Sequence, residues 1–288
     1  MGKLAIIDGD SLCYLGSKTD TLQQIIEKVD NKVSDILTET KADFYILLVS
    51  KGKYFRHNIS EGSYKAKRTY DTQIWVKTIK EYLIVKYKAV FQSNLEADDL
   101  VSWLMNQRLY LNVLISGKEI IDSYIPDSSQ LSSSEEIDKI LVTKDKDLLY
   151  SIPGKHLNFS KKLSSEEWGM EWVETSINDA PFFIWEQMVC GDVGDNVTGL
   201  WKKGKAWCDK NFVNKSLREV QHLVFDEYIK DYGTEKGIYE FSKNYRLLYM
   251  LKTNEDFMRE VGYIPILPEF QKVTLNSQIE KLDDDLTF

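Results

Sequence analysis

Nine acidic residues fall into four groups that together could bind divalent cations. The groups are Asp8 and Asp10; Glu96, Asp98 and Asp99; Asp145 and Asp147; and Asp192 and Asp195. Carboxylates at close range raise each other's pKa, so this many can share a pocket only with bound cations or added protons. An all-oxygen set without His or Cys suits Mg²⁺ or Mn²⁺. Two such ions about 4 Å apart could hold the attacking and leaving oxygens of a phosphodiester.

Short apolar segments precede three of these groups and are typical of buried strands. They are Leu4–Ile7, Lys88–Phe91 and Ile140–Val142, and Phe44–Val49 is a further apolar strand. Helical spacing of apolar residues over Thr21–Thr40 predicts a helix between two strands, and hence a βαβ unit with a parallel sheet. Ligands of open parallel sheets bind outside the carboxyl ends of the strands, so we expect these acids to meet at that edge.

The remaining pattern predicts more helices and one internal boundary. Further helices are expected over Ile74–Val85, Asp98–Asn106, Phe183–Val189, Leu217–Ile229 and Tyr239–Met250. The Ser-rich stretch Asp127–Ser134 is expected to be a loop. The composition shift near residue 178 predicts a boundary there, after which the chain is helical.

Charge is unevenly distributed along the chain. The net charge is −8 and the pI is near 5.1, which by themselves argue against a nucleic-acid partner. Two stretches are nevertheless basic, namely Lys51, Lys53, Arg56, Lys65, Lys67 and Arg68, and Lys202, Lys203, Lys205, Lys210, Lys215 and Arg218. Such stretches indicate localised phosphate contacts, although a solvated surface face has the same composition.

Cysteine usage and hydropathy bear on the compartment. The three cysteines are scattered and odd in number, which predicts a reduced cytosolic protein without a disulfide framework. No apolar run approaches the roughly 20 residues that a membrane helix needs, and the apolar start is too short for a signal peptide.

Five motifs in order resemble those of the flap endonuclease or 5′-nuclease family. They are Ile7-Asp8-Gly9, Tyr64–Arg68, Glu96–Asp99, Thr143–Leu148 and Gly191–Asn196. The likeness is to phage 5′-exonucleases, phage RNase H and the 5′-nuclease domain of bacterial DNA polymerase I, and it covers about residues 3–210. It implies a PIN-like α/β fold, with a mixed, mainly parallel sheet, flanking helices and a helical arch. It also implies a nuclease core over residues 1–178, with the arch at about 51–95, and a helix–three-turn–helix and C-terminal helical region over 179–288.

The resemblance also implies roles for the acidic residues. One metal ion would be held by Asp8, Glu96 and Asp98, and Asp99 would support this cluster. The second ion would be held by Asp145, Asp147, Asp192 and Asp195. Lys65 and Arg68 would contact the scissile phosphate, where a cation stabilises charge on the transferring group.

Nucleic-acid contacts are implied at two places. In and beside the arch, the first basic stretch predicts contacts at Lys51, Lys53, Arg56 and Lys67. Tyr64 would either stack on a terminal base or pack under the arch. The second place is a hairpin over residues 197–206, whose contacts would be Gly199, Lys202, Lys203, Gly204 and Lys205. Lys202 stands where the family has a glycine, which puts the K⁺ site of the family's hairpin in doubt.

Ser50 is the main departure from the family pattern. The family has a metal-binding aspartate at the position that Ser50 occupies. One interpretation is that Asp10 substitutes for it, directly or through water. The other is that the first metal binds weakly and the enzyme is slow or Mn²⁺-dependent. An engineered substitution at Ser50 is a further alternative.

These features predict a two-metal, Mg²⁺-dependent 5′-nuclease, with Mn²⁺ able to substitute, acting in DNA replication. Its substrates would be branched or nicked DNA, 5′ flaps and RNA–DNA hybrids, including RNA primers. We expect a monomer in the bacterial or phage-infected bacterial cytoplasm, without a membrane partner. Two alternatives are a structure-specific DNA-binding protein with a weakened active site and a PIN-type ribonuclease. The acidic tail, residues 280–288, is either a frayed end or a docking segment for a replication protein.

Overall fold

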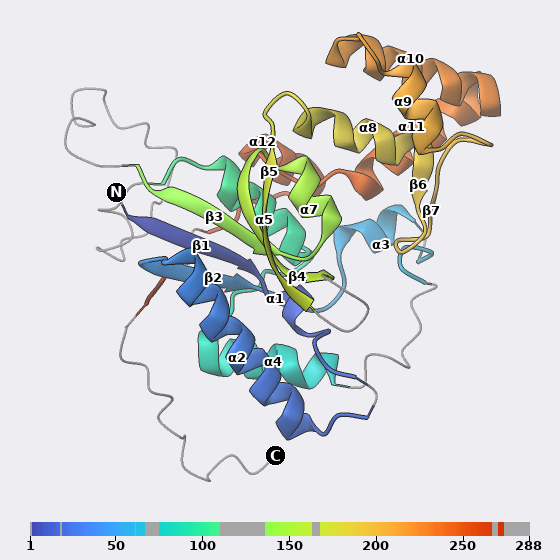
Figure 1. Ribbon diagram of the computed structural model, residues 1–288. Coiled ribbons are helices and arrows are strands. Elements are labelled where there is room, and N and C mark those ends of the chain that lie inside the picture. Colours follow the sequence, from blue (N-terminus) through green and yellow to red (C-terminus); the bar gives the residue numbers. More distant parts are fainter. Residues whose placement is uncertain are drawn as a thin grey trace.

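A six-stranded sheet forms the centre of the protein (Figure 1). The computed structural model describes residues 2–17, 19–60, 62–66, 75–109, 136–162, 168–266 and 270–273. The strand order is β5-β4-β3-β1-β2-β8, with β1 parallel to β2 and β3, β4 parallel to β3, and antiparallel strands at both edges. The strands are β1 (Lys3–Asp8), β2 (Phe44–Leu48), β3 (Asp138–Thr143), β4 (Gly154–Lys162), β5 (Trp168–Thr175) and β8 (Gln271–Lys272). This mixed, mainly parallel sheet with flanking helices confirms the predicted fold class.

Helices cover both faces of the sheet, which explains why β1 is apolar throughout. Leu4 and Ile6 belong to the core shared with α5 (Ala97–Asn106) and α12 (Asn254–Glu260). Ala5 and Ile7 belong to the core on the opposite face, under α2 (Leu22–Thr40) and α4 (Val76–Tyr87). Since successive strand side chains point to opposite faces, a strand covered on both sides has no polar positions to spare.

Most predicted elements are present with small shifts of their ends. Thr21 caps α2 by accepting a hydrogen bond from the Gln24 amide, which fixes where that helix begins. The strand expected at Lys88–Phe91 is wrong, because only Val90 forms an isolated bridge, with Leu48. The Ser-rich stretch expected to be a loop lies outside the described residues.

A second, helical unit forms beside the sheet (Figure 1). Its elements are α8 (Ala180–Cys190), β6 (Gly191–Asp192), β7 (Val197–Thr198), α9 (Lys205–Asn211), α10 (Leu217–Tyr232) and α11 (Thr234–Leu248). They share a separate core that includes Trp185, Val224 and Tyr228. After α11 the chain returns to the sheet, since Met250 and Phe257 pack in the first core. The boundary near residue 178 stays a prediction.

Short helices follow several strands. They are α1 (Gly9–Leu12), α3 (Phe55–Ile59) and α7 (Lys146–Ser151). Within the segment predicted to form an arch, α3 contacts α11, and α4 packs on the sheet through Ile79 and Leu83. Residues 67–74 of that segment, including Lys67 and Arg68, lie outside the described residues.

Arg56 joins α3, α5 and the end of α11. It is 2% exposed, and all five of its N–H donors are used. Two donate to Asp99 at 2.6 and 2.8 Å, one to Glu96 at 3.0 Å, and two to the carbonyls of Leu247 and Tyr249 at 3.0 and 2.6 Å. The prediction that Arg56 contacts nucleic acid is therefore wrong, because no donor remains for a phosphate.

Replacing Arg56 by methionine is expected to lower the free energy of unfolding by about 3–5 kcal/mol, because Asp99 then stays buried and unpaired. The double variant Arg56→Met/Asp99→Asn should lose less than the sum of the two single losses. Urea unfolding followed by circular dichroism at pH 7 measures all three. If the two single losses add up to the loss of the double variant, the interaction between Arg56 and Asp99 does not contribute to stability.

Candidate active site

A cavity of about 530 Å³ opens where β1 and β3 end. Its wall brings together members of the first three acid groups and several lysines: Asp8, Asp10, Glu96, Asp98, Asp145, Lys65, Lys144 and Lys146, with Ser50. A smaller hollow of about 30 Å³ is lined by Asp147 and Asp195 and shares Glu96 and Asp98 with the cavity. The acids from distant parts of the sequence thus meet at one edge of the sheet, as the strand pattern predicts.

Asp8 is fixed at the end of β1. Its carboxylate accepts hydrogen bonds from the Ser11 amide at 3.2 Å, from the Ser11 hydroxyl and from Thr143 Oγ1 at 2.8 Å. Burial raises the pKa of Asp8 to about 6, and the charges of Asp10 and Asp145 add to the rise. The two hydroxyls oppose this rise but also fix the direction of the carboxylate.

Asp10 lies against the position that Ser50 occupies. Asp10 Oδ1 accepts a hydrogen bond from the Ser50 amide at 2.9 Å and lies 2.8 Å from Lys80 Nζ. The Ser50 hydroxyl accepts the Ala97 amide at 2.8 Å, so it satisfies an otherwise unpaired donor at the start of α5. Asp10 is therefore beside the position whose ligand it was predicted to replace, and its role as a ligand stays a prediction.

Glu96, which is buried, and Asp98, which is partly buried, differ sharply in their surroundings near the start of α5. Glu96 accepts from Lys65, from Arg56 at 3.0 Å and from the Tyr64 hydroxyl at 2.9 Å. Burial acts to raise the pKa of Glu96, but the charges of Lys65 and Arg56 outweigh it and lower that pKa to about 2. Within the described ranges Asp98 accepts no hydrogen bond, and burial together with Asp145 and Asp8 raises its pKa well above the usual range.

Asp99 does not share the cavity. Its side chain is fully buried and pairs with Arg56, and it also accepts the Leu251 amide at 3.1 Å. It supports the cluster by holding Arg56, which in turn contacts Glu96, and by accepting the Glu96 amide at 3.3 Å. These contacts agree with a supporting position for Asp99, and its part in metal binding stays a prediction.

Asp145 and Asp147 lie at the start of α7. Asp145 caps this helix by accepting the Asp147 amide at 2.8 Å, and its own amide donates to Thr143 Oγ1 at 2.9 Å. Burial raises the pKa of Asp145, and burial and the charge of Asp145 raise that of Asp147 to about 7. Asp147 Oδ1 is buried and has no hydrogen-bond partner among the described residues, although Lys146 Nζ is 3.8 Å from it.

The hairpin acids reach the site from the helical unit. Asp195 Oδ2 accepts the Tyr64 hydroxyl at 2.8 Å, and Asp192 Oδ1 accepts the Asp195 amide at 3.0 Å. Lys65 Nζ lies 3.8 Å from Asp195 Oδ1 and also contacts Glu96. Tyr64 is 4% exposed, packs in the core of the helical unit and bridges Glu96 and Asp195, so its predicted stacking on a base is wrong. The alternative, packing under the arch, stays a prediction.

The remaining predicted nucleic-acid contacts differ in availability. Lys203 is largely buried and pairs with Asp231 at 2.8 Å and Glu227 at 3.0 Å, and its contact with phosphate stays a prediction. Gly199 is structural as well, because a Cβ there would overlap the Val189 carbonyl and the Gly191 amide. Exposed lysines remain at positions 51, 53, 202 and 205, although Lys51 pairs with Glu81 and Lys205 pairs with Glu186 and Asp209. A Cβ at Gly204 would meet open space, so this position leaves room for a backbone contact.

Three lysines at the site were not predicted. Lys144 and Lys146 flank Asp145 in the sequence, and this neighbourhood was the signal that could have identified them. Lys80 comes from α4 and pairs with Asp10 while donating to the Ser50 carbonyl at 2.8 Å. Nothing in the local sequence of α4 marks Lys80 as different from other surface lysines.

The donor chemistry of the site fits a hard divalent cation. Oxygen ligands predominate, four aspartates have raised pKa values, and Asp147 Oδ1 has no hydrogen-bond donor in the described part of the chain. Within that part, no group of three or more acidic, His or Cys side chains is arranged so that it could hold a metal ion. Lysine ammonium groups lie among the carboxylates, so a divalent cation would replace lysine contacts rather than enter a preformed cage.

Solved structures with a similar fold include nucleases. Bacteriophage T5 D15 protein co-crystallised with metal ions is 17% identical with a TM-score of 0.44, over 90% of this chain and 88% of that one. T5 5′-exonuclease with bound zinc is 17% identical with a TM-score of 0.48, over 85% and 86%. The catalytic core of Rad2 in complex with DNA substrate is 11% identical with a TM-score of 0.41, over 91% and 89%.

Other comparisons add no closer relative. No family model and no curated protein matches the chain. The identities and TM-scores above assign neither an activity nor site residues to this protein. Among the described helices, none has the length and apolar character needed to cross a membrane.

Asp147→Asn is expected to stabilise the protein above pH 7 in EDTA. The raised pKa means that folded Asp147 keeps a proton that the unfolded chain has lost, so the free energy of unfolding falls as pH rises from about 4 to about 7. Asparagine carries no charge and so removes this loss. We expect the free energy of unfolding of the variant to exceed that of the wild type by about 2–4 kcal/mol at pH 8, and this difference to vanish near pH 4. Added Mg²⁺ should stabilise the wild type and reduce the difference.

Urea unfolding at several pH values measures this effect. The matched control is Asp226→Asn, at an exposed aspartate of α10. If the free energy of unfolding depends on pH equally in Asp147→Asn and the wild type, the pKa of Asp147 is not raised in the folded protein.

Proposed function

We propose that this protein is a metal-dependent, structure-specific 5′-nuclease that hydrolyses phosphodiesters in branched or nicked DNA, 5′ flaps and RNA–DNA hybrids. The observation that carries the proposal is the cavity in which Asp8, Asp98 and Asp145, from three distant segments, repel one another beside Lys65. Such a site requires cations before an anionic substrate can approach. The five sequence motifs support the same function.

The carboxylates divide into two candidate ligand sets. Asp8, Glu96 and Asp98, with Asp10 beside Ser50, would hold one Mg²⁺ or Mn²⁺ ion. The second set comprises Asp145, Asp147, Asp192 and Asp195. Bound divalent ions would lower the pKa of an attacking water and stabilise charge on the phosphoryl group.

The protein's own residues orient and neutralise the reacting groups. The Thr143 hydroxyl donates a hydrogen bond to Asp8 and accepts one from the Asp145 amide, so one hydroxyl aligns acids that follow two strands. Lys65, beside Glu96 and Asp195, can move its ammonium to a phosphate oxygen and stabilise developing charge. Exposed lysines such as Lys53 and Lys202 would attract the sugar–phosphate backbone in a sequence-independent, salt-sensitive manner.

A second candidate is a DNA-binding protein of the same fold with a weakened active site. Ser50 favours it, because its hydroxyl already accepts the Ala97 amide and offers no carboxylate. A role in replication, RNase H activity on primers and docking through the acidic tail are finer parts of the first proposal. So are a monomeric state and a division into a nuclease core and a helical region near residue 178.

Asp145→Asn is expected to reduce metal-dependent cleavage by about 10³-fold, because it removes the charge of a ligand, whereas the asparagine side chain can still accept the Asp147 amide and cap α7. Binding to a flap should persist, since repulsion of phosphate is relieved. The measurement uses a 5′-labelled flap, a nicked duplex and an RNA–DNA hybrid with Mg²⁺, Mn²⁺ or EDTA. Wild-type protein that binds flaps but cleaves none of the three would favour the second candidate, and near-normal cleavage by Asp145→Asn would sink the ligand assignment.

Ser50→Asp is expected to lower the Mg²⁺ concentration for half-maximal cleavage about tenfold. A carboxylate there can keep the Ala97 hydrogen bond and offer its second oxygen beside Asp10. Asp10→Ala should raise the same concentration. If neither change alters the Mg²⁺ titration, Asp10 is a turn residue and no metal binds beside Ser50.

A further inference from the structure

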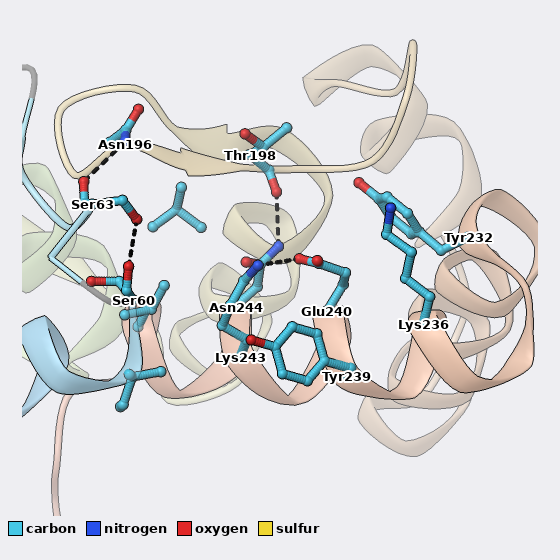
Figure 2. A pocket seen from close by; sticks show the side chains of 13 residues that line it. Ser60, Ser63, Asn196, Thr198, Tyr232, Lys236, Tyr239, Glu240, Lys243 and Asn244 are labelled. Atoms are coloured by element: carbon cyan, nitrogen blue, oxygen red, sulfur yellow. Dashed lines mark hydrogen bonds and ion pairs between the residues drawn. The ribbon is translucent and has the colours of Figure 1, made fainter.

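A polar groove runs along α11, outside the acidic cavity. It consists of two hollows of about 420 and 550 Å³ that share Tyr232, Lys236 and Tyr239. Figure 2 shows the first hollow, with the α11 side chains below the hairpin that carries Asn196 and Thr198. The shared residues make the two hollows one continuous groove.

The groove begins next to the candidate active site. Ser63 and Asn196 line its inner end, whereas their chain neighbours Lys65 and Asp195 line the acidic hollows. The Asn196 side chain donates to the Ser63 carbonyl at 2.9 Å, and the Lys65 amide donates to the Asp195 carbonyl at 3.1 Å. A single crossing of two backbone segments therefore separates the groove from the carboxylates.

Aromatic rings and lysines alternate along the groove. Lys236 Nζ lies 5.6 Å from the ring centre of Tyr232, and Lys243 Nζ lies 5.3 Å from that of Tyr239. Tyr239 is 56% exposed and Lys236 is exposed as well, whereas Lys243 pairs with Glu240, which also lines the groove. Exposed rings that accept unstacked bases, together with cations for the backbone, are the elements of single-strand recognition.

The walls of the groove are fixed before any ligand arrives. Asn244 is 3% exposed and donates to the Thr198 carbonyl at 2.7 Å and to the Tyr228 hydroxyl at 2.9 Å, which joins the hairpin to α10 and α11. At Gly237 a Cβ would lie 2.8 Å from the Tyr228 carbonyl, so α10 and α11 are in close contact. Fixed walls reduce the entropy lost on binding.

We propose that this groove binds a single-stranded nucleic-acid segment that continues from the strand held at the carboxylates. This inference rests on the proposed function, because the groove starts where that strand would leave the active site. A duplex keeps its bases stacked internally and offers no free base to Tyr239. The segment would place bases against Tyr239 and Tyr232 and a phosphate near Lys236.

The test compares Tyr239→Ala with Tyr239→Phe and with Ile238→Ala as the matched control. Ile238 is 49% exposed on the same helix and lines neither hollow. Fluorescence anisotropy in EDTA measures binding of labelled oligothymidine and of a blunt duplex. We expect Tyr239→Ala to bind the single strand about tenfold more weakly and the duplex as the wild type does. Tyr239→Phe and Ile238→Ala should bind both as the wild type does.

Lys236→Ala provides a second, independent readout. Losing one phosphate contact should reduce the slope of log K against log salt for the single strand by about 0.7. Unchanged single-strand affinity in Tyr239→Ala, or equal losses for single strand and duplex, would overturn the proposal. Because these measurements need no cleavage, Tyr239-dependent single-strand binding by an inactive protein would support the groove while refuting the nuclease. Cleavage by a protein whose single-strand binding does not depend on Tyr239 would support the nuclease while refuting the groove.

Discussion

Mutual repulsion among buried carboxylates is the constraint on which the rest of this structure depends. Burial raises the pKa of Asp8, Asp98, Asp145 and Asp147, so each would be easier to bury as a neutral side chain. The fold nevertheless holds them together because each stands at a fixed strand end or helix start. Backbone amides bond to Asp8 and Asp145, and the Thr143 hydroxyl serves both segments. Stability lost in this way is typical of a site kept for binding cations.

The positive charges that balance these acids are of two kinds. Arg56 is buried with every donor occupied, so its charge is a permanent part of the fold. The lysine contacts are different: Lys65 and Lys80 are partly exposed, and Lys146 is more exposed still. A flexible ammonium can leave a carboxylate without breaking the core, whereas a guanidinium bound to two carbonyls cannot. The site therefore has a fixed frame and an exchangeable set of counter-charges.

The sequence predicted where the acids meet but, apart from Lys65, not which cations meet them. Strand–helix–strand periodicity was sufficient to bring Asp8 and Asp145 to one sheet edge, because parallel strands end on the same side. Arg56 was assigned to phosphate from a basic stretch alone. Its true partners include the Leu247 and Tyr249 carbonyls, about 190 residues away, which no local pattern encodes. The β4–β5 hairpin was also missed, since its edge position leaves a largely polar sequence without a long apolar run.

The crossing of residues 63–65 with residues 195–196 connects these observations. On one side lies a cavity where negative charge dominates, and on the other lies a groove of rings and lysines. Tyr64 is in the middle, and its hydroxyl bonds Glu96 and Asp195, so it anchors the crossing to the acids. Any shift of the hairpin would therefore alter both the second ligand set and the inner end of the groove. Since Asn244 joins that hairpin to α11, the helix that forms the groove also helps to position Asp195 at the carboxylates.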